Sequence, residues 1–116
     1  KEDVWVARIP ARVTGVVEWP VSQDFESIDD VMALSEWNIY EPVWAPLSIV
    51  ADPLDADNRV LEMRDEEPVD YSRIERVLPE SQIVSATFRV NAQQIPLGYA
   101  LNIEFQDKHG ARIAAK

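Results

Sequence analysis

The chain has 116 residues, 47% of them hydrophobic, with 21 acidic against 11 basic residues and a formal net charge of −10 at pH 7. Such a chain can bury one small core, and its negative charge disfavours nucleic acid and anionic membrane surfaces as partners. The lack of cysteine excludes disulfides, thiolate catalysis and cysteine-ligated zinc. The sequence contains no run of about 18 apolar residues, the length that a membrane span would need.

The first predicted strand covers residues 1–10, where apolar and polar side chains alternate up to Pro10. It starts with the chain itself, and residues 111–116 begin a last strand that no later segment can pair. We therefore expect a piece of a larger protein. A second strand is predicted over 13–19, and the polar residues 20–26 after it are expected to link two bodies.

Two short segments have a helical pattern. Ser27, followed three residues later by Asp30, fits a capping box ahead of apolar residues that share one helical face. Residues 71–78 suit a helix and a strand edge equally well, because short windows do not separate the two periods. We expect one of the two segments to be a short helix.

The middle of the chain predicts strands. Residues 37–40 form a short one, and the alternating segments 44–52 and 59–65 are expected to pair as a hairpin around the polar turn that begins at Asp52. Pro53 keeps the residue before it extended.

The alternation is clearest in the last third of the chain, over residues 82–92 and again over 99–107. A turn with Gly110 at a position that needs a positive φ should lead into 111–116 and close a hairpin. The predicted fold class is therefore all-β and antiparallel.

Carboxylates are the candidate catalytic groups. A glycosidase needs two of them about 5 to 10 Å apart, and the strand-borne ones are Glu62, Asp65, Glu75 and Glu104. Among 21 acidic residues several fall on strands by chance, so solvated strand faces are the expected explanation for them. The single histidine, His109, excludes a multi-histidine metal site and is expected in an exposed turn.

One loop gathers oxygen ligands of the kind that calcium prefers: Asp52, Asp55, Asp57 and Asn58. The loop lacks the glycine and the distal glutamate of an EF-hand. A structural calcium site and an ordinary aspartate turn are the two interpretations, and no other cofactor is indicated.

Three aromatic residues are candidates for sugar binding. Trp37, Tyr40 and Trp44 lie close enough in sequence to share a surface, and flat aromatic rings stack on the apolar faces of sugars. Packing in the core or at an interface is the alternative for each ring. Trp5 and Trp19 flank the predicted linker and suit an interface.

Two groups of residues resemble a known family. The run Lys1-Glu2-Asp3-Val4-Trp5-Val6-Ala7-Arg8-Ile9-Pro10 resembles the closing strand of bacterial sialidase-like, BNR-repeat β-propellers. Residues 37–40, 44–46 and 58–71 resemble the β-sandwich region that follows such propellers in carbohydrate-active proteins. The Asp-box motif of the propeller blades is absent.

The resemblance implies an architecture: residues 1–19 end a propeller, 20–26 are a linker, and 27–116 form a concanavalin-like jelly-roll sandwich that lacks its last strands. Those strands and the propeller would be its partners within the parent protein. Concanavalin-like sandwiches often hold calcium, which would fall in the aspartate loop.

The resemblance also implies a function. The parent would be a secreted or periplasmic glycoside hydrolase, and this chain a non-catalytic accessory module that stabilises the propeller or binds polysaccharide. Two alternatives stay open: a catalytic sandwich, glycosidase or polysaccharide lyase, that uses strand carboxylates, and a purely structural interaction domain.

Overall fold

The structure, a computed structural model, describes residues 12–13, 19–66, 69–93, 101–107, 109–110 and 112–115. The chain divides into two compact units, Lys1–Gln82 and Ile83–Lys116, which are treated separately. The strand predicted over 1–10 lies outside the described residues, as does most of the one over 13–19.

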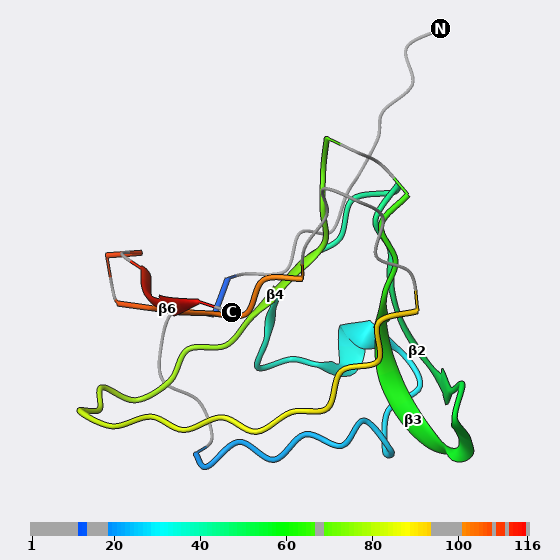
Figure 1. Ribbon diagram of the computed structural model, residues 1–116, viewed down its shortest axis with the longest axis horizontal. Coiled ribbons are helices and arrows are strands. Elements are labelled where there is room, and N and C mark those ends of the chain that lie inside the picture. The colour runs from blue at the N-terminus through cyan, green and yellow to red at the C-terminus, as the bar shows by residue number, and fades with distance from the viewer. Residues whose placement is uncertain are drawn as a thin grey trace, which may run out of the picture. The chain divides into compact units, whose positions relative to one another are not determined.

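The described part of the chain is all-β, which confirms the predicted class (Figure 1). Among the described residues, the first unit holds one 3-10 turn and four strands and the second holds two strands, and each of these strands pairs with one antiparallel neighbour. The elements are η1 (Val31–Ala33), β1 (Asn38–Tyr40), β2 (Leu47–Asp52), β3 (Asp55–Met63), β4 (Arg73–Glu75), β5 (Glu104–Gln106) and β6 (Arg112–Ala115).

Strands β2 and β3 form the predicted hairpin, the long pair labelled in Figure 1. Leu47 lies opposite Met63 and Ile49 opposite Leu61, and the register shifts between Ala51 and Asp52. Leu47 and Ile49 are 4% and 9% exposed, whereas Ser48 between them is only half-buried. The period-two alternation therefore assigned the inner face of β2 correctly.

Strand β1 pairs with β4, with Ile39 opposite Ile74. Of the two interpretations of residues 71–78, the strand is the correct one, because the segment finds a neighbour with which its backbone pairs. The helical turn lies at η1 instead. Its N-cap is Asp30, whose Oδ1 accepts from the Met32 amide at 2.8 Å, so the cap comes three residues later than Ser27.

The core of the first unit lies between the two strand pairs and η1. Val31, Leu34 and Leu47 are its buried centre. Partly buried side chains from the strands, from the segment before η1 and from the residue just before β1 pack against it, namely Phe25, Ile28, Trp37, Ile39, Leu61 and Ile74. Two facing strand pairs around one apolar layer are what part of a β-sandwich provides.

In the second unit β5 pairs with β6, and Gly110 takes the predicted positive φ of 81° in the turn between them. The strand predicted over residues 82–92 is wrong. This segment is described, yet it belongs to no ladder and its side chains are exposed. Alternating apolar and polar side chains make a segment suitable for a sheet. A strand forms only where a neighbouring segment supplies the backbone hydrogen bonds.

Candidate functional site

Two of the predicted sugar-binding aromatics, one just before β1 and one at its end, point to opposite sides. Side chains alternate along extended backbone, so Trp37, just before β1, and Ile39 face the core while Asn38 and Tyr40 face outward. The Trp37 ring packs on the core cluster, and the Arg76 guanidinium lies 5.3 Å from its centroid. Its Nε1 is buried and has no hydrogen-bond partner among the described residues. Trp37 is therefore a packing residue in this structure.

Tyr40 ends β1 with 46% of its surface exposed. Its hydroxyl donates to Asp70 Oδ2 at 3.0 Å, and the Arg73 guanidinium carbon lies 5.9 Å from the ring centroid. The hydrogen bond to the Asp70 carboxylate, followed by the negative charge of Asp70, raises the pKa of the Tyr40 phenol above its usual value. Tyr40 is thus a neutral ring whose hydroxyl and one face are held by charged neighbours.

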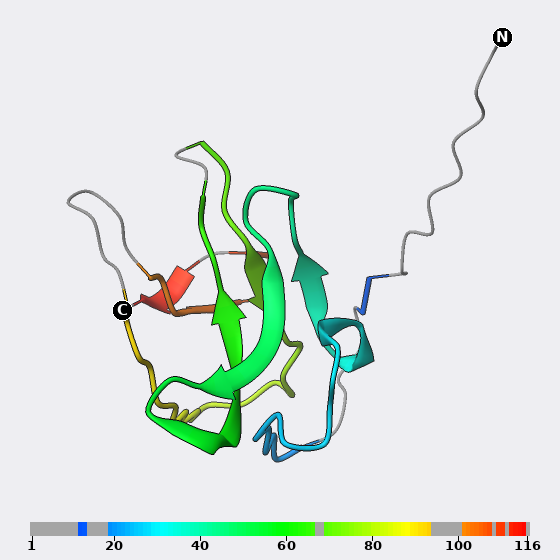
Figure 2. The same cartoon turned by 90° about the vertical axis from the view of Figure 1, so that its right-hand side faces the viewer.

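Trp44 lies in the loop between β1 and β2 and is 56% exposed. The Glu66 amide donates to the Trp44 carbonyl at 2.9 Å, and the Arg64 amide donates to the Pro46 carbonyl at 3.1 Å. These bonds continue the β2–β3 pairing beyond the strands and tie the loop before β2 to the loop after β3. Both loops lie at the same end of the first unit, as Figures 1 and 2 show from two directions.

Three residues that the sequence analysis did not select complete this surface. Tyr71 is 60% exposed and close enough to Tyr40 to affect its electrostatics, and the Tyr71 amide donates to Asp70 Oδ1 at 2.9 Å. Arg73 lies directly opposite Tyr40 in the β1–β4 register. We call Tyr40, Asp70, Tyr71 and Arg73, which these interactions connect, together with the exposed Trp44 four residues after Tyr40, the aromatic patch. The strand pattern of 71–78 was the signal that would have found it, because pairing with β1 brings this segment beside Tyr40.

The patch combines the two kinds of contact that a sugar needs. Three exposed rings offer flat apolar faces, and a carboxylate and a guanidinium offer acceptors and donors for hydroxyls. Arg73 Nε is 3.2 Å from Glu75 Oε1, which orients its side chain.

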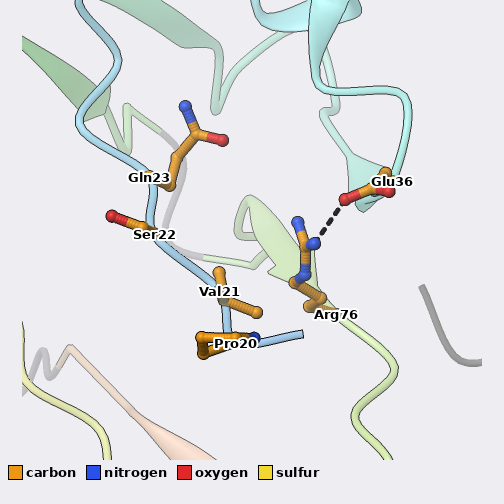
Figure 3. A pocket seen from close by; sticks show the side chains of 6 residues that line it. All are labelled: Pro20, Val21, Ser22, Gln23, Glu36 and Arg76. Carbon is orange, nitrogen blue, oxygen red and sulfur yellow. Dashed lines mark hydrogen bonds and ion pairs between the residues drawn. The ribbon is translucent and has the colours of Figure 1, made fainter. Parts of the chain in front are cut away.

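A small pocket occurs elsewhere in the first unit (Figure 3). It measures about 110 Å³ and is lined by Pro20, Val21, Ser22, Gln23, Glu36 and Arg76. Arg76 points toward Glu36 and forms an ion pair with it. Small-molecule sites are commonly about 300 to 1,000 Å³, so this pocket is too small to enclose a sugar ring.

In the aspartate loop, carboxylate oxygens accept hydrogen bonds from backbone and side-chain groups of the same loop. Asp52 accepts from the Leu54 amide at 2.9 Å and from Asn58 Nδ2 at 3.1 Å, and Asp55 accepts from the Asp57 amide at 3.2 Å. Across the described residues no three His, Cys, Asp or Glu side chains gather as a metal site would require. Calcium binding here stays a prediction.

The candidate catalytic carboxylates are held by ordinary partners. Glu62 accepts from Ser48 Oγ at 3.1 Å and from Arg64 Nη2 at 3.0 Å, and Glu75 is paired with Arg12 and Arg73. Glu104 accepts from Gln106 Nε2 at 2.9 Å. Glu62 and Glu104 belong to different compact units, so the structure gives no geometry for them as a pair. Asp65 and His109 are exposed.

Comparison with known proteins gives one family match. Residues 37–115 match the family described as sialidase-like, CBM domain. No curated protein and no solved structure matches significantly. Within the described residues no helix has the length and apolar character to cross a membrane. The match spans more than half of the chain, and it includes β1 to β6 and every residue of the aromatic patch. The chain therefore belongs to the sialidase-like carbohydrate-binding module domain family.

Proposed function

We propose that this domain is a non-catalytic accessory module that binds carbohydrate through the aromatic patch, and that it serves a multidomain, sialidase-like glycoside hydrolase. The observation that carries the proposal is the exposure of Tyr40, Trp44 and Tyr71, at 46%, 56% and 60%, with Asp70 and Arg73 in contact with the Tyr40 side chain. Membership of a carbohydrate-binding family supports the ligand class.

The physical case rests on how sugars are bound. Aromatic rings exposed at rigid points stack on the C–H faces of a pyranose, and nearby charged groups select hydroxyl positions. Tyr40 is held by β1, by Asp70 and by Arg73. Its side chain therefore loses little conformational entropy when a ligand binds. Trp44 is held through its backbone, which leaves its indole available to a ligand.

Retention on immobilised polysaccharides, in affinity gels or on a glycan array, tests this function. We expect Trp44→Ala and Tyr71→Ala each to weaken binding on the order of tenfold, because each removes one stacking surface. Trp19→Ala is the matched control, since Trp19 is also an exposed tryptophan, at 47%, but lies outside the patch. Absence of retention on every polysaccharide would reject this function and favour the structural interaction domain.

The accessory role and its location belong to the same proposal. A module that binds polysaccharide would work where polysaccharide is found, so we propose a secreted or periplasmic parent with a preceding propeller. Purification of the parent with and without residues 27–116 tests the two accessory roles. Loss of polysaccharide retention with unchanged propeller stability supports binding, whereas a lower melting temperature of the propeller supports stabilisation.

The catalytic alternative is tested with one substitution. Hydrolysis or eliminative cleavage of a glycan by this chain that Glu62→Gln abolishes would show that a strand carboxylate is catalytic. We expect no such activity, because Glu62 is engaged by Ser48 and Arg64 rather than by a second carboxylate.

A further inference from the structure

Asn38, on the outward side of β1, binds the backbone of a residue far away in the sequence. The Val13 amide donates to Asn38 Oδ1 at 2.7 Å, and Asn38 Nδ2 donates to the Val13 carbonyl at 2.7 Å. A side-chain amide carries both a donor and an acceptor, so it satisfies both backbone groups of one residue as a neighbouring strand would. Val13 is thereby fixed against β1.

The residue before Val13 is tied to the neighbouring strand. Arg12 Nη2 lies 2.9 Å from Glu75 Oε2, and Glu75 is the register partner of Asn38. The other oxygen of the same carboxylate, Oε1, lies 3.2 Å from Arg73 Nε. Glu75 therefore connects Arg12 with Arg73.

This connection ends at the aromatic patch. The Arg73 guanidinium, paired with Glu75, has its central carbon 5.9 Å from the centroid of the Tyr40 ring. The Tyr40 hydroxyl donates a hydrogen bond to Asp70. A single exposed ion pair contributes little. Here two guanidinium groups share one carboxylate, and the two short hydrogen bonds of Asn38 fix the backbone from which Arg12 extends.

We propose that residues 12–13 are an anchored segment of this module, and that their attachment to Asn38 positions Glu75 and, through it, Arg73 over the Tyr40 ring. Asn38 is a positioning residue in this scheme, and it need not touch the ligand. The proposal rests on the proposed function only in that Tyr40 and Arg73 belong to the aromatic patch.

Trypsin tests the anchor, because the chain offers matched cleavage sites. The bonds Arg12–Val13 and Arg89–Val90 have the same two residues, but Arg89 and Val90 are exposed and outside any strand. A protease needs a free, extended backbone, so we expect cleavage at Arg12–Val13 to be slower on the order of tenfold. Asn38→Ala should remove most of this difference. Asn91→Ala, a change at an exposed asparagine, should leave it intact.

The bond Arg59–Val60, inside β3, separates loss of the anchor from unfolding. In Asn38→Ala the acceleration should be confined to Arg12–Val13. Asn38→Asp keeps the shape and the acceptor but faces the Val13 carbonyl with a carboxylate, so it should also accelerate cleavage there. No acceleration in either variant, or equal acceleration at Arg59–Val60 in both, would overturn the anchor.

The NMR signals of the Tyr40 ring test the positioning, whether or not a sugar is bound. Arg12→Ala and Asn38→Ala should each move these signals in the direction seen for Arg73→Ala, because Arg73→Ala removes the guanidinium from the ring and the other two variants displace it. Unchanged Tyr40 signals in the first two variants would overturn the positioning. Failure of the wild-type chain to bind any polysaccharide would reject the proposed function and leave this result standing.

Discussion

Strand β2 and residues 82–92 have the same alternation of apolar and polar side chains but reach different structures. In β2, Leu47 and Ile49 are 4% and 9% exposed. In the second segment, Phe88 and Val90 are 53% and 54% exposed, and the segment pairs with no strand. An amphipathic pattern is therefore stabilising only where a partner strand and an opposing apolar layer are present, and β2 has β3 as its partner strand and η1 packed against it.

The largest expected effect tests whether stability is concentrated in the first unit. Leu47→Ala removes a buried side chain from the centre of the core and should cost about 2 to 4 kcal/mol of unfolding free energy. Phe88→Ala, a larger truncation at an exposed site, should cost less than about 1 kcal/mol. Urea unfolding of both variants measures this. Equal losses would mean that residues 82–92 are packed as β2 is.

A smaller effect separates the observed helix cap from the one that the sequence suggested. Asp30→Ala removes the acceptor of the Met32 amide and should cost about 1 kcal/mol. Ser27→Ala should change the free energy of unfolding by less than about 0.5 kcal/mol. The reverse order, again from urea unfolding, would place the cap at Ser27.

The turn in the second unit gives an effect of similar or smaller size. Gly110 has a φ of +81° with open space around the position of a Cβ, so Gly110→Ala meets no clash but takes up an unfavourable backbone conformation. We expect a local cost of about 1 kcal/mol, seen as faster amide hydrogen exchange in the β5–β6 hairpin, with the β2–β3 amides unaffected. Faster exchange in both hairpins would show that the two units are energetically coupled.

The smallest effect is a pH dependence in the first unit. Partial burial, and then the charge of Asp30, raise the pKa of Glu41. A carboxyl whose pKa is higher in the folded state destabilises the fold when ionised, so its penalty appears as pH rises above the unfolded-state pKa. Glu41→Gln should be slightly more stable than wild type at pH 7, and the gain should shrink below about pH 4. A gain that does not change with pH would assign the effect to packing.

The local features of this protein follow from its amino-acid sequence. Strand alternation identified the inner face of β2, and the polar turn at Asp52 predicted the β2–β3 hairpin. Gly110 predicted the turn before the last strand, because few other residues tolerate a positive φ. The residues that resemble the sandwich region of sialidase-like proteins pointed to the family that the comparison confirmed.

Long-range packing selects which alternating segments become strands and which aromatic rings stay exposed. Trp37 and Tyr40 are both aromatic and only three residues apart, but Trp37, just before β1, packs on the core, whereas Tyr40, at the end of β1, is exposed. Asp70, Tyr71 and Arg73 joined the patch because β4 pairs with β1, a contact between residues more than 30 positions apart. Such contacts depend on which surfaces meet, and the period of a sequence carries no information about that.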